Sequence, residues 1–171
     1  MNRPVRIRHE QSRDIDAIHE VTVAAFLNAP HSDHNEQVIV QGLRKAGALS
    51  VSLVAEQDGR VVGHVAVSPV SVSDGAADWY GLGPISVLPE YQGQGVGSRL
   101  MRRALSELQA LGAAGCVLLG DPDYYHRFGF KAMTRLRFPG VPPEYFQALP
   151  FIADLPDGTV QYHPAFFPPH D

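Results

Sequence analysis

The sequence has little of what marks secreted or membrane-spanning proteins. It contains one cysteine, Cys116, in 171 residues, so no disulfide can form within the chain. No apolar run approaches the roughly 20 residues that a membrane span needs. The basic start, residues 1–8, is not followed by the apolar core of a signal peptide. These features favour a reduced, cytoplasmic setting without a membrane partner.

Positive charge is also scarce. The chain has 14 Lys and Arg against 18 Asp and Glu, a formal net charge of −4, and duplex binding depends on many phosphate-neutralising cations. We therefore expect no nucleic-acid partner. Apolar residues make up 44%, which is enough for a sizeable core, and the length favours a single domain over residues 1–171. Proline is crowded after Arg137, so residues 138–171 are expected to be rich in loops.

The first half of the chain alternates between helical and extended patterns. Residues 5–8 alternate as a strand does, and Ser12 is a candidate cap for an amphipathic helix that ends near Phe26. A second helix is expected from Asp33, whose spacing to Glu36 suits a capping box.

Two valine-rich strands follow, residues 50–56 and 60–72. Asp58-Gly59 between them is a strong hairpin signal. A third extended stretch covers residues 79–88 and contains Gly81-Leu82-Gly83-Pro84, which predicts a bulge or bend.

The second half contains a strand–helix–strand unit. The period is helical over residues 95–111, and the apolar run at residues 116–119 is typical of a buried strand, so a right-handed parallel crossover is expected. Asp121-Pro122-Asp123 is a helix start. We further predict strands at residues 130–137 and 159–163.

The most informative segment joins the third extended stretch to the long helix. Its residues are Gln92, Gly93, Gln94, Gly95, Val96, Gly97 and Ser98. Alternating glycines at a helix entrance let several backbone N–H groups and the helix dipole converge on phosphate oxygens. A Walker-type loop is excluded because no Lys lies between Glu90 and Ser98. A dinucleotide fingerprint also fails, because the third glycine and the later acidic residue are absent.

The remaining pattern is Gln-x-x-Gly-x-Gly, and here the chain resembles the GNAT family of acyl-CoA N-acyltransferases. The approach strand at residues 82–91 matches, and Tyr125 to Phe130 is similar to the family's Tyr-x-x-x-Gly-Phe segment. The resemblance covers residues 3–137 in element order. Residues 50–130 look most like the small bacterial YhbS-like predicted N-acetyltransferases. The resemblance to the GNAT family implies an α/β fold with a mixed, twisted central sheet, splayed at an acyl-CoA cleft, and helices on both faces.

The resemblance also implies an activity. Acetyl-CoA would be the co-substrate, and an amine would attack its acetyl group directly in a ternary complex. Ile85, Ser86 and Val87 match the strand that pairs with the pantetheine arm, with the Val87 N–H polarising the thioester oxygen. The seven residues from Gln92 to Ser98 match the pyrophosphate cradle. Tyr125 matches the tyrosine that protonates the departing thiolate.

The general base is not fixed by a motif. The candidates are Glu36, then Glu56, then His64; Glu36 is also explained as a helix-capping carboxylate, and His64 as a hydrogen-bonded core residue. His31 and His34 have metal-ligand spacing, but no second cluster completes a site, so no metal is expected.

Other features stay open at this point. Cys116 lies in an apolar run, which indicates that it is a small buried residue. Arg99, Arg102 and Arg103 either reach the 3′-phosphate of CoA or form a solvated helix face. Four aromatic residues have three open interpretations: they line an acceptor pocket, they form a dimer interface, or they fill the core. These residues are Trp79, Tyr80, Phe166 and Phe167.

Acceptor selectivity is expected in the loop at residues 138–150. A small-molecule or peptide amine acceptor and a homodimer are both compatible with the sequence. The main alternative function is an acyl-CoA-binding sensor or partner module without turnover. A nucleotide-binding module is weakened by the missing Lys.

Overall fold

The computed structural model describes residues 4–30 and 32–168 and is built on a six-stranded sheet. In spatial order its strands are β1 (Arg6–His9), β2 (Val51–Gln57), β3 (Arg60–Pro69), β5 (Trp79–Val87), β6 (Gly115–Leu119) and β8 (Phe146–Pro150). All neighbours are antiparallel except β5 and β6, which are parallel. A small second sheet contains β4 (Ser71–Val72), β9 (Gly158–Gln161) and β7 (Leu136–Arg137).

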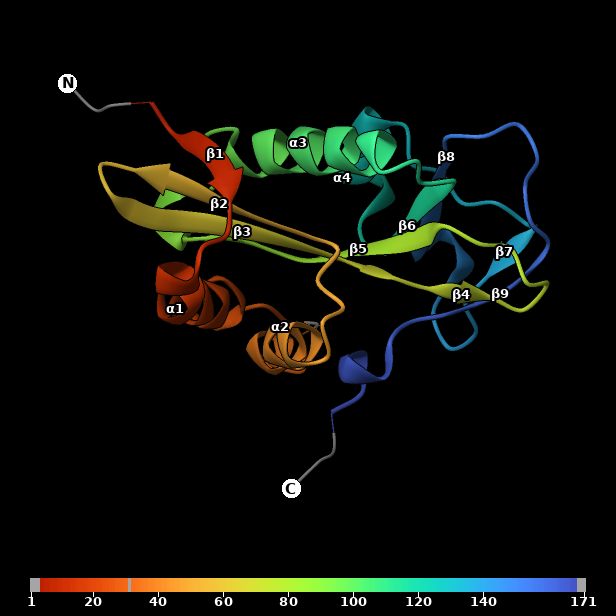
Figure 1. The fold of residues 1–171 in the computed structure, drawn as a ribbon, viewed down its shortest axis with the longest axis horizontal. Coiled ribbons are helices and arrows are strands. Elements are labelled where there is room, and N and C mark those ends of the chain that lie inside the picture. The colour runs from red at the N-terminus through yellow and green to blue at the C-terminus, as the bar shows by residue number, and fades with distance from the viewer. Residues whose placement is uncertain (1–3, 31, 169–171) are drawn as a thin grey trace.

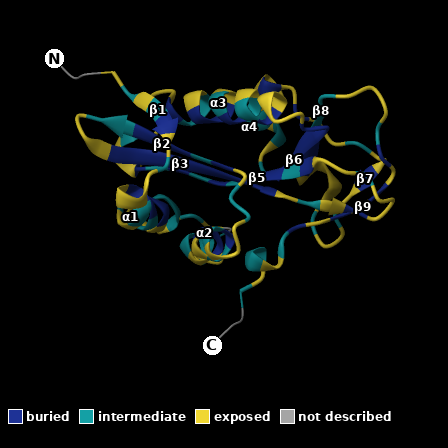
Figure 2. Ribbon diagram, viewed as in Figure 1, coloured by how far each residue is buried: buried dark blue, intermediate teal, exposed yellow. Residues whose placement is uncertain are grey.

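Helices cover both faces of the large sheet, as the family resemblance implies. The helices α1 (Ile15–Phe26) and α2 (Glu36–Lys45) lie on one face, and α3 (Val96–Ala110) and α4 (Pro122–Tyr125) lie on the other (Figure 1). The strands between these layers are the most buried part of the fold (Figure 2). In α3, four residues at helical spacing are fully buried, which confirms the predicted apolar face: Leu100, Met101, Ala104 and Leu108.

The hairpin between β2 and β3 forms as predicted. Asp58 and Gly59 both have positive φ, 52° and 80°, as a two-residue turn between twisted strands requires. The register runs from Gln57 opposite Arg60 to Val51 opposite Val67. This long pair forms the centre of the sheet and carries β5 on its far side.

Strand β5 is splayed from β6, and this opening positions the candidate site. β5 pairs with β6 only over Trp79–Gly81, whereas it follows β3 as far as Val87. Its register against β3 shifts between Val65 and Val67, beside the Gly81–Pro84 stretch where a bulge was expected. Beyond Gly81, the side of β5 that faces β6 is therefore an open strand edge in the described part of the chain.

Two predictions in the C-terminal third were wrong, those for residues 130–137 and 138–150, whereas the strand predicted at residues 159–163 corresponds to β9. Residues 138–150 are not all loop, because β8 pairs antiparallel with β6, with Leu149 opposite Cys116. The strand was missed because it is short, ends in proline and contains a buried polar residue, Gln147, whose amide nitrogen donates to the Gly120 carbonyl oxygen at 3.0 Å. Residues 130–137, predicted as a strand, form only a bridge at Lys131 and the two residues of β7.

The start of α2 also differs from the prediction. The helix begins at Glu36, with Asn35 at the N-cap, rather than near Asp33. Ser32, not Asp33, provides the local partner, because its hydroxyl donates to the Glu36 carboxylate. The predicted Asp33–Glu36 capping box was wrong because Ser32, which precedes the helix, is the residue that donates to the Glu36 carboxylate.

Candidate functional site

The glycine loop at the start of α3 forms one wall of a cleft of about 320 Å³. Gly93 and Gly95 have φ values of 76° and 84°, which residues with a Cβ rarely adopt. The cleft is lined by Val87, Tyr91, Gln92, Gly93, Gly95, Gly97, Ser98, Tyr124 and Arg127. Two of the predicted cradle residues stand apart from this lining: Gln94 donates to the Glu90 carbonyl oxygen, and the Val96 side chain is buried in the core.

Arg127 is a cleft residue that sequence reasoning missed. Its Nε donates to the Tyr124 carbonyl oxygen at 2.9 Å, and its guanidinium lies 4.6 Å from the centre of the Tyr124 ring. Its position five residues after a helix-capping Asp-Pro gives no signal in the sequence, because the orientation depends on packing against Tyr124.

The three arginines considered for a phosphate role have protein partners instead. Arg99 donates to the Val5 carbonyl oxygen, and Arg103 donates to Glu107 at 3.1 Å. The Arg102 guanidinium lies 5.1 Å from the centre of the Phe128 ring. Among the residues that line this cleft, the positive charge therefore comes from Arg127.

A second cavity, of about 380 Å³, lies at the other end of the open edge of β5. It brings together the two side chains predicted to be catalytic, Glu36 at the start of α2 and Tyr125 at the end of α4. The rest of its lining is Phe26, Ile39, Leu82, Gly83, Pro84, Ile85, Leu119, Phe138, Tyr162, Phe166 and Phe167. Trp79 is buried in the core beside it, and Tyr80 packs on the core.

The open edge of β5 connects the two cavities. Ile85 lines the Glu36 cavity and Val87 lines the glycine-loop cleft. The Leu88 N–H donates to the Val62 carbonyl oxygen on the β3 side at 2.9 Å. Because backbone groups alternate along a strand, those of Val87 and Ile85 point to the open edge, whereas those of Ser86 point to β3. The Val87 carbonyl oxygen accepts from the Gln92 side chain at 2.9 Å.

Tyr125 is held tightly by its surroundings. Its ring packs edge-on against Tyr124, with centroids 4.9 Å apart, and a Cβ on Gly120 would lie 2.3 Å from it. Burial, with smaller contributions from Tyr124 and Asp121, raises the pKa of the phenol to about 12. The hydroxyl is therefore protonated at neutral pH and can act as a proton donor.

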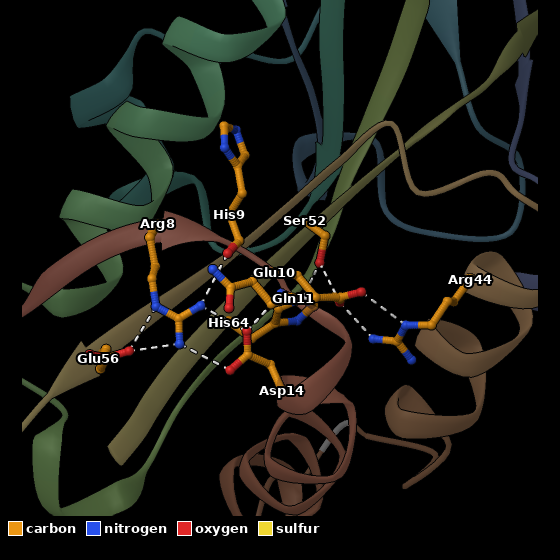
Figure 3. A network of polar contacts seen from close by, with 9 residues as sticks. All are labelled: Arg8, His9, Glu10, Gln11, Asp14, Arg44, Ser52, Glu56 and His64. Atoms are coloured by element: carbon orange, nitrogen blue, oxygen red, sulfur yellow. Dashed lines mark hydrogen bonds and ion pairs between the residues drawn. The ribbon is translucent and has the colours of Figure 1, made fainter. Parts of the chain in front are cut away.

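The other two base candidates, Glu56 and His64, belong to a network of polar contacts (Figure 3). Arg8 bridges Asp14 at 2.8 Å and Glu56 at 2.6 Å. His64 Nε2 lies 2.8 Å from the Ser52 hydroxyl. Neither Glu56 nor His64 is among the residues that line the Tyr125 cavity.

His64 stays neutral at neutral pH because burial lowers its pKa to about 4. Its Nδ1 has no hydrogen-bond partner among the described residues, and the same holds for the hydroxyl of Ser86, its register partner on β5. Both lie in the sheet interior, so His64 fits its second interpretation, a buried core residue.

The same network attaches α1 and α2 to the sheet. Glu10 accepts from Arg44 of α2 at 2.7 Å and from the Ser52 hydroxyl at 2.7 Å. Burial acts to raise the pKa of Glu10, but the hydrogen bonds from Arg44 and Ser52 outweigh it and lower the pKa. The ion pair therefore fixes the far end of α2, whose first residue is Glu36.

Metal and thiol chemistry receive no support from these surroundings. The described residues include no group of three or more His, Cys, Asp or Glu side chains arranged to hold a metal ion, and His31 lies outside them. Cys116 is fully buried, and burial raises the pKa of its thiol. Over the same part of the chain, no helix has both the length and the apolar character to cross a bilayer.

A splayed sheet with a glycine loop at one end of the gap and a partly buried tyrosine at the other defines an acyl-CoA N-acyltransferase fold. Residues 48–132 match the acetyltransferase (GNAT) domain family. The chain is 37% identical to the N-acetyltransferase YhbS of Escherichia coli K12 over 152 residues, which covers 84% of this chain and 90% of that protein. The chain therefore belongs to the GNAT family of N-acetyltransferases.

Solved structures agree with this assignment. A GNAT acetyltransferase from Brucella melitensis, in complex with acetyl-CoA, is 50% identical with a TM-score of 0.86, covering 95% of this chain and 98% of that one. The Escherichia coli YhbS structure, in complex with CoA, is 35% identical with a TM-score of 0.83, covering 95% and 91%.

Proposed function

We propose that this protein transfers the acetyl group of acetyl-CoA to an amine by direct attack in a ternary complex. The observation that carries the proposal is the open edge of β5, which runs from the glycine-loop cleft to the cavity shared by Glu36 and Tyr125. The Brucella relative, half identical to this chain, was crystallised with acetyl-CoA. Acetyl-CoA supplies the acetyl group as a thioester.

The glycine loop and Arg127 hold the phosphates in this proposal. The N–H groups at the start of α3 and the positive end of its dipole favour a pyrophosphate, and the absence of side chains at Gly93, Gly95 and Gly97 permits close approach. Gln92 and Ser98 complete the cradle, to which Gln94 and Val96 contribute only backbone. Val87 and Ile85 offer backbone groups to the pantetheine arm, in the manner of an added strand.

Glu36 and Tyr125 perform the proton transfers. The ammonium form of the acceptor first loses a proton to solvent. The neutral amine nitrogen then bonds to the acetyl carbon, and the proton that this nitrogen releases passes to the Glu36 carboxylate, directly or through water. The carbon–sulfur bond then breaks, and the departing sulfur takes the Tyr125 hydroxyl proton, which solvent later restores. The Val87 N–H, which points to the open edge, stabilises the carbonyl oxygen as it gains charge.

Cys116 supports direct attack over an acetylated enzyme. Its thiol is fully buried and its pKa is raised, so no accessible thiolate is available from the chain's single cysteine. We expect initial-rate lines that intersect when acetyl-CoA and the amine are varied together. Parallel lines, with an acetyl adduct on the protein by mass spectrometry, would contradict direct transfer.

The alternative, an acyl-CoA-binding sensor without turnover, makes a different prediction. Such a module would bind acetyl-CoA saturably but release no CoA with any amine. A cytoplasmic location and a homodimer stay predictions.

A further inference from the structure

The cavity that holds Glu36 and Tyr125 has walls of a particular chemical kind. One wall comes from α1 and α2 and presents Phe26 and Ile39. A neighbouring wall comes from the C-terminal segment, which packs against α2, and presents Phe166 and Phe167. Of the loop at residues 138–150, where selectivity was expected, only Phe138 reaches the lining. Parts of the chain distant in sequence therefore build one apolar, aromatic pocket.

Charge in this pocket is limited to one end. Glu36 is the single carboxyl side chain in the lining, which contains no Lys, Arg or His; the other titratable groups are the phenols Tyr125 and Tyr162. Burial raises the pKa of the Tyr162 phenol well above its usual value, so this phenol carries no charge. One carboxylate can pair with one ammonium group, and further cations on a ligand would have no partner.

The size and rim of the pocket fit a small molecule. A volume of about 380 Å³ lies at the lower end of the range for small-ligand sites. Leu119 and Phe167 are 43% and 62% exposed, so apolar surface continues to the rim. A cavity of this composition gains affinity from an apolar ligand body rather than from a chain of hydroxyl groups.

We propose that the acceptor is a small primary amine attached to an apolar body of the size of an aromatic ring. This inference rests on the proposed acetyl transfer, which it makes specific. The amine lies toward Glu36 and Tyr125, and the body lies against Phe26, Phe166 and Phe167. Polyamines and aminoglycosides are disfavoured because their additional ammonium groups would be desolvated without partners.

A longer acyl chain is the competing occupant of the same apolar space. Glu36 favours the amine as the occupant, because a carboxylate in the wall attracts an ammonium group and makes no favourable electrostatic interaction with a hydrocarbon tail. The competing reading predicts that butyryl-CoA or hexanoyl-CoA is a better donor than acetyl-CoA.

The test compares acceptors of the same reactive group. With wild-type protein and acetyl-CoA, kcat/KM is measured by CoA release for 2-phenylethylamine, ethanolamine and spermidine. We expect the value for 2-phenylethylamine to exceed that for ethanolamine by about 100-fold, because the pocket's apolar contacts discriminate between the two bodies. Faster turnover of ethanolamine or spermidine would overturn the acceptor inference and leave acetyl transfer standing.

A binding measurement tests the acceptor inference separately from the proposed acetyl transfer, because binding of the amine does not require turnover. Titration calorimetry of 2-phenylethylamine into CoA-loaded protein is run on wild type, Phe167→Ala and Glu36→Gln. Both changes are expected to weaken binding about tenfold, since each removes one contact of the amine. The matched controls are Leu111→Ala, another exposed apolar residue, and Glu144→Gln, a carboxylate on the surface; both are outside the pocket.

Each outcome has a defined meaning. Pocket-dependent binding of 2-phenylethylamine, with no CoA release from acetyl-CoA by any amine, would support the recognition and refute the proposed function. Binding that Phe167→Ala and Glu36→Gln leave unchanged, or no binding, would overturn the inference. A donor preference for hexanoyl-CoA that Phe167→Ala abolishes would assign the pocket to the acyl chain instead.

Discussion

Tyr125 is the residue on which the proposed chemistry depends most directly. Changing Tyr125 to Phe keeps the ring contacts with Tyr124 and Phe130 but removes the acidic proton. We expect kcat for CoA release to fall about 100-fold or more, as the loss of a general acid does. The measurement is steady-state CoA release at saturating acetyl-CoA.

The matched control for this substitution is Tyr145→Phe. Tyr145 is 44% exposed and lies outside both cavities. The control should keep wild-type kcat. If Tyr125→Phe also keeps it while folding normally, the proton for the thiolate comes from another group.

His64 makes a prediction about stability rather than activity. Its pKa is lowered to about 4 in the folded protein, whereas an unfolded histidine titrates near 6.5. Below pH 6.5 the unfolded chain therefore binds a proton that the folded chain resists, and the free energy of unfolding falls. Between pH 7.5 and 5 this loss is about 2 kcal/mol.

Thermal unfolding at several pH values checks this effect. His64→Gln should show a shallower fall of Tm with decreasing pH than wild type, even if its Tm at pH 7.5 is lower. His126→Gln, an exposed histidine, should keep the wild-type slope. An unchanged slope in His64→Gln would mean that His64 is not protected from protons in the folded state.

At this scale a motif fixed the position of one candidate, Tyr125, whose catalytic role stays a prediction. The spacing to Gly129-Phe130 singled out Tyr125, which lines the cavity with Glu36. Arg127 was missed because its position depends on stacking with Tyr124 in three dimensions. The sequence could not establish which of Glu36, Glu56 and His64 is the general base. Alternation along a strand predicts the face of the sheet on which Glu56 and His64 lie, but not the residues that they contact.

At the scale of elements, two glycines in turns have nearly equal backbone φ angles but different proposed roles. Gly59 in the hairpin and Gly95 at the start of α3 have φ of 80° and 84°, and a Cβ on either would meet no protein atom within 4 Å. Alanine at either position should therefore cost a similar amount of stability, about 1 kcal/mol. At Gly95, however, the new methyl group enters the space proposed for the pyrophosphate.

The comparison of these two variants isolates the binding role of the loop. Gly95→Ala should raise the Kd for CoA at least tenfold, and Gly59→Ala should leave it unchanged, as measured by calorimetry. Equal CoA affinity in the two variants would argue against the glycine loop as the phosphate site.

The elements that sequence predicted well share a strong local signal. The hairpin has its two-residue turn and α3 has its apolar period, so their positions follow from local chemistry. β8 lacked such a signal, since its five residues include a buried glutamine and a proline. Its place beside β6 depends on non-local pairing, and the Gln147 amide nitrogen donates to the carbonyl oxygen of Gly120, which is distant in sequence.

At the scale of the whole molecule, acetyl-CoA is proposed to contact β5, the glycine loop and α4 together. A ligand that binds the folded state at 100 times its Kd adds about 2.7 kcal/mol of stability. For a domain of this size we expect Tm to rise by roughly 5 to 10 °C. ATP and NAD at the same concentration should give no comparable shift, and a rise with ATP alone would favour a nucleotide site.

The central claim is the transfer itself, and the most direct measurement is detection of its product. The purified protein is incubated with acetyl-CoA and 2-phenylethylamine, and the amine is analysed by mass spectrometry alongside a protein-free reaction. The proposed function predicts an N-acetylated amine that forms together with an equal amount of CoA, and at a strongly reduced rate with Tyr125→Phe. Saturable binding of acetyl-CoA without acetylated product from this or any other amine tested would contradict it and favour a sensor.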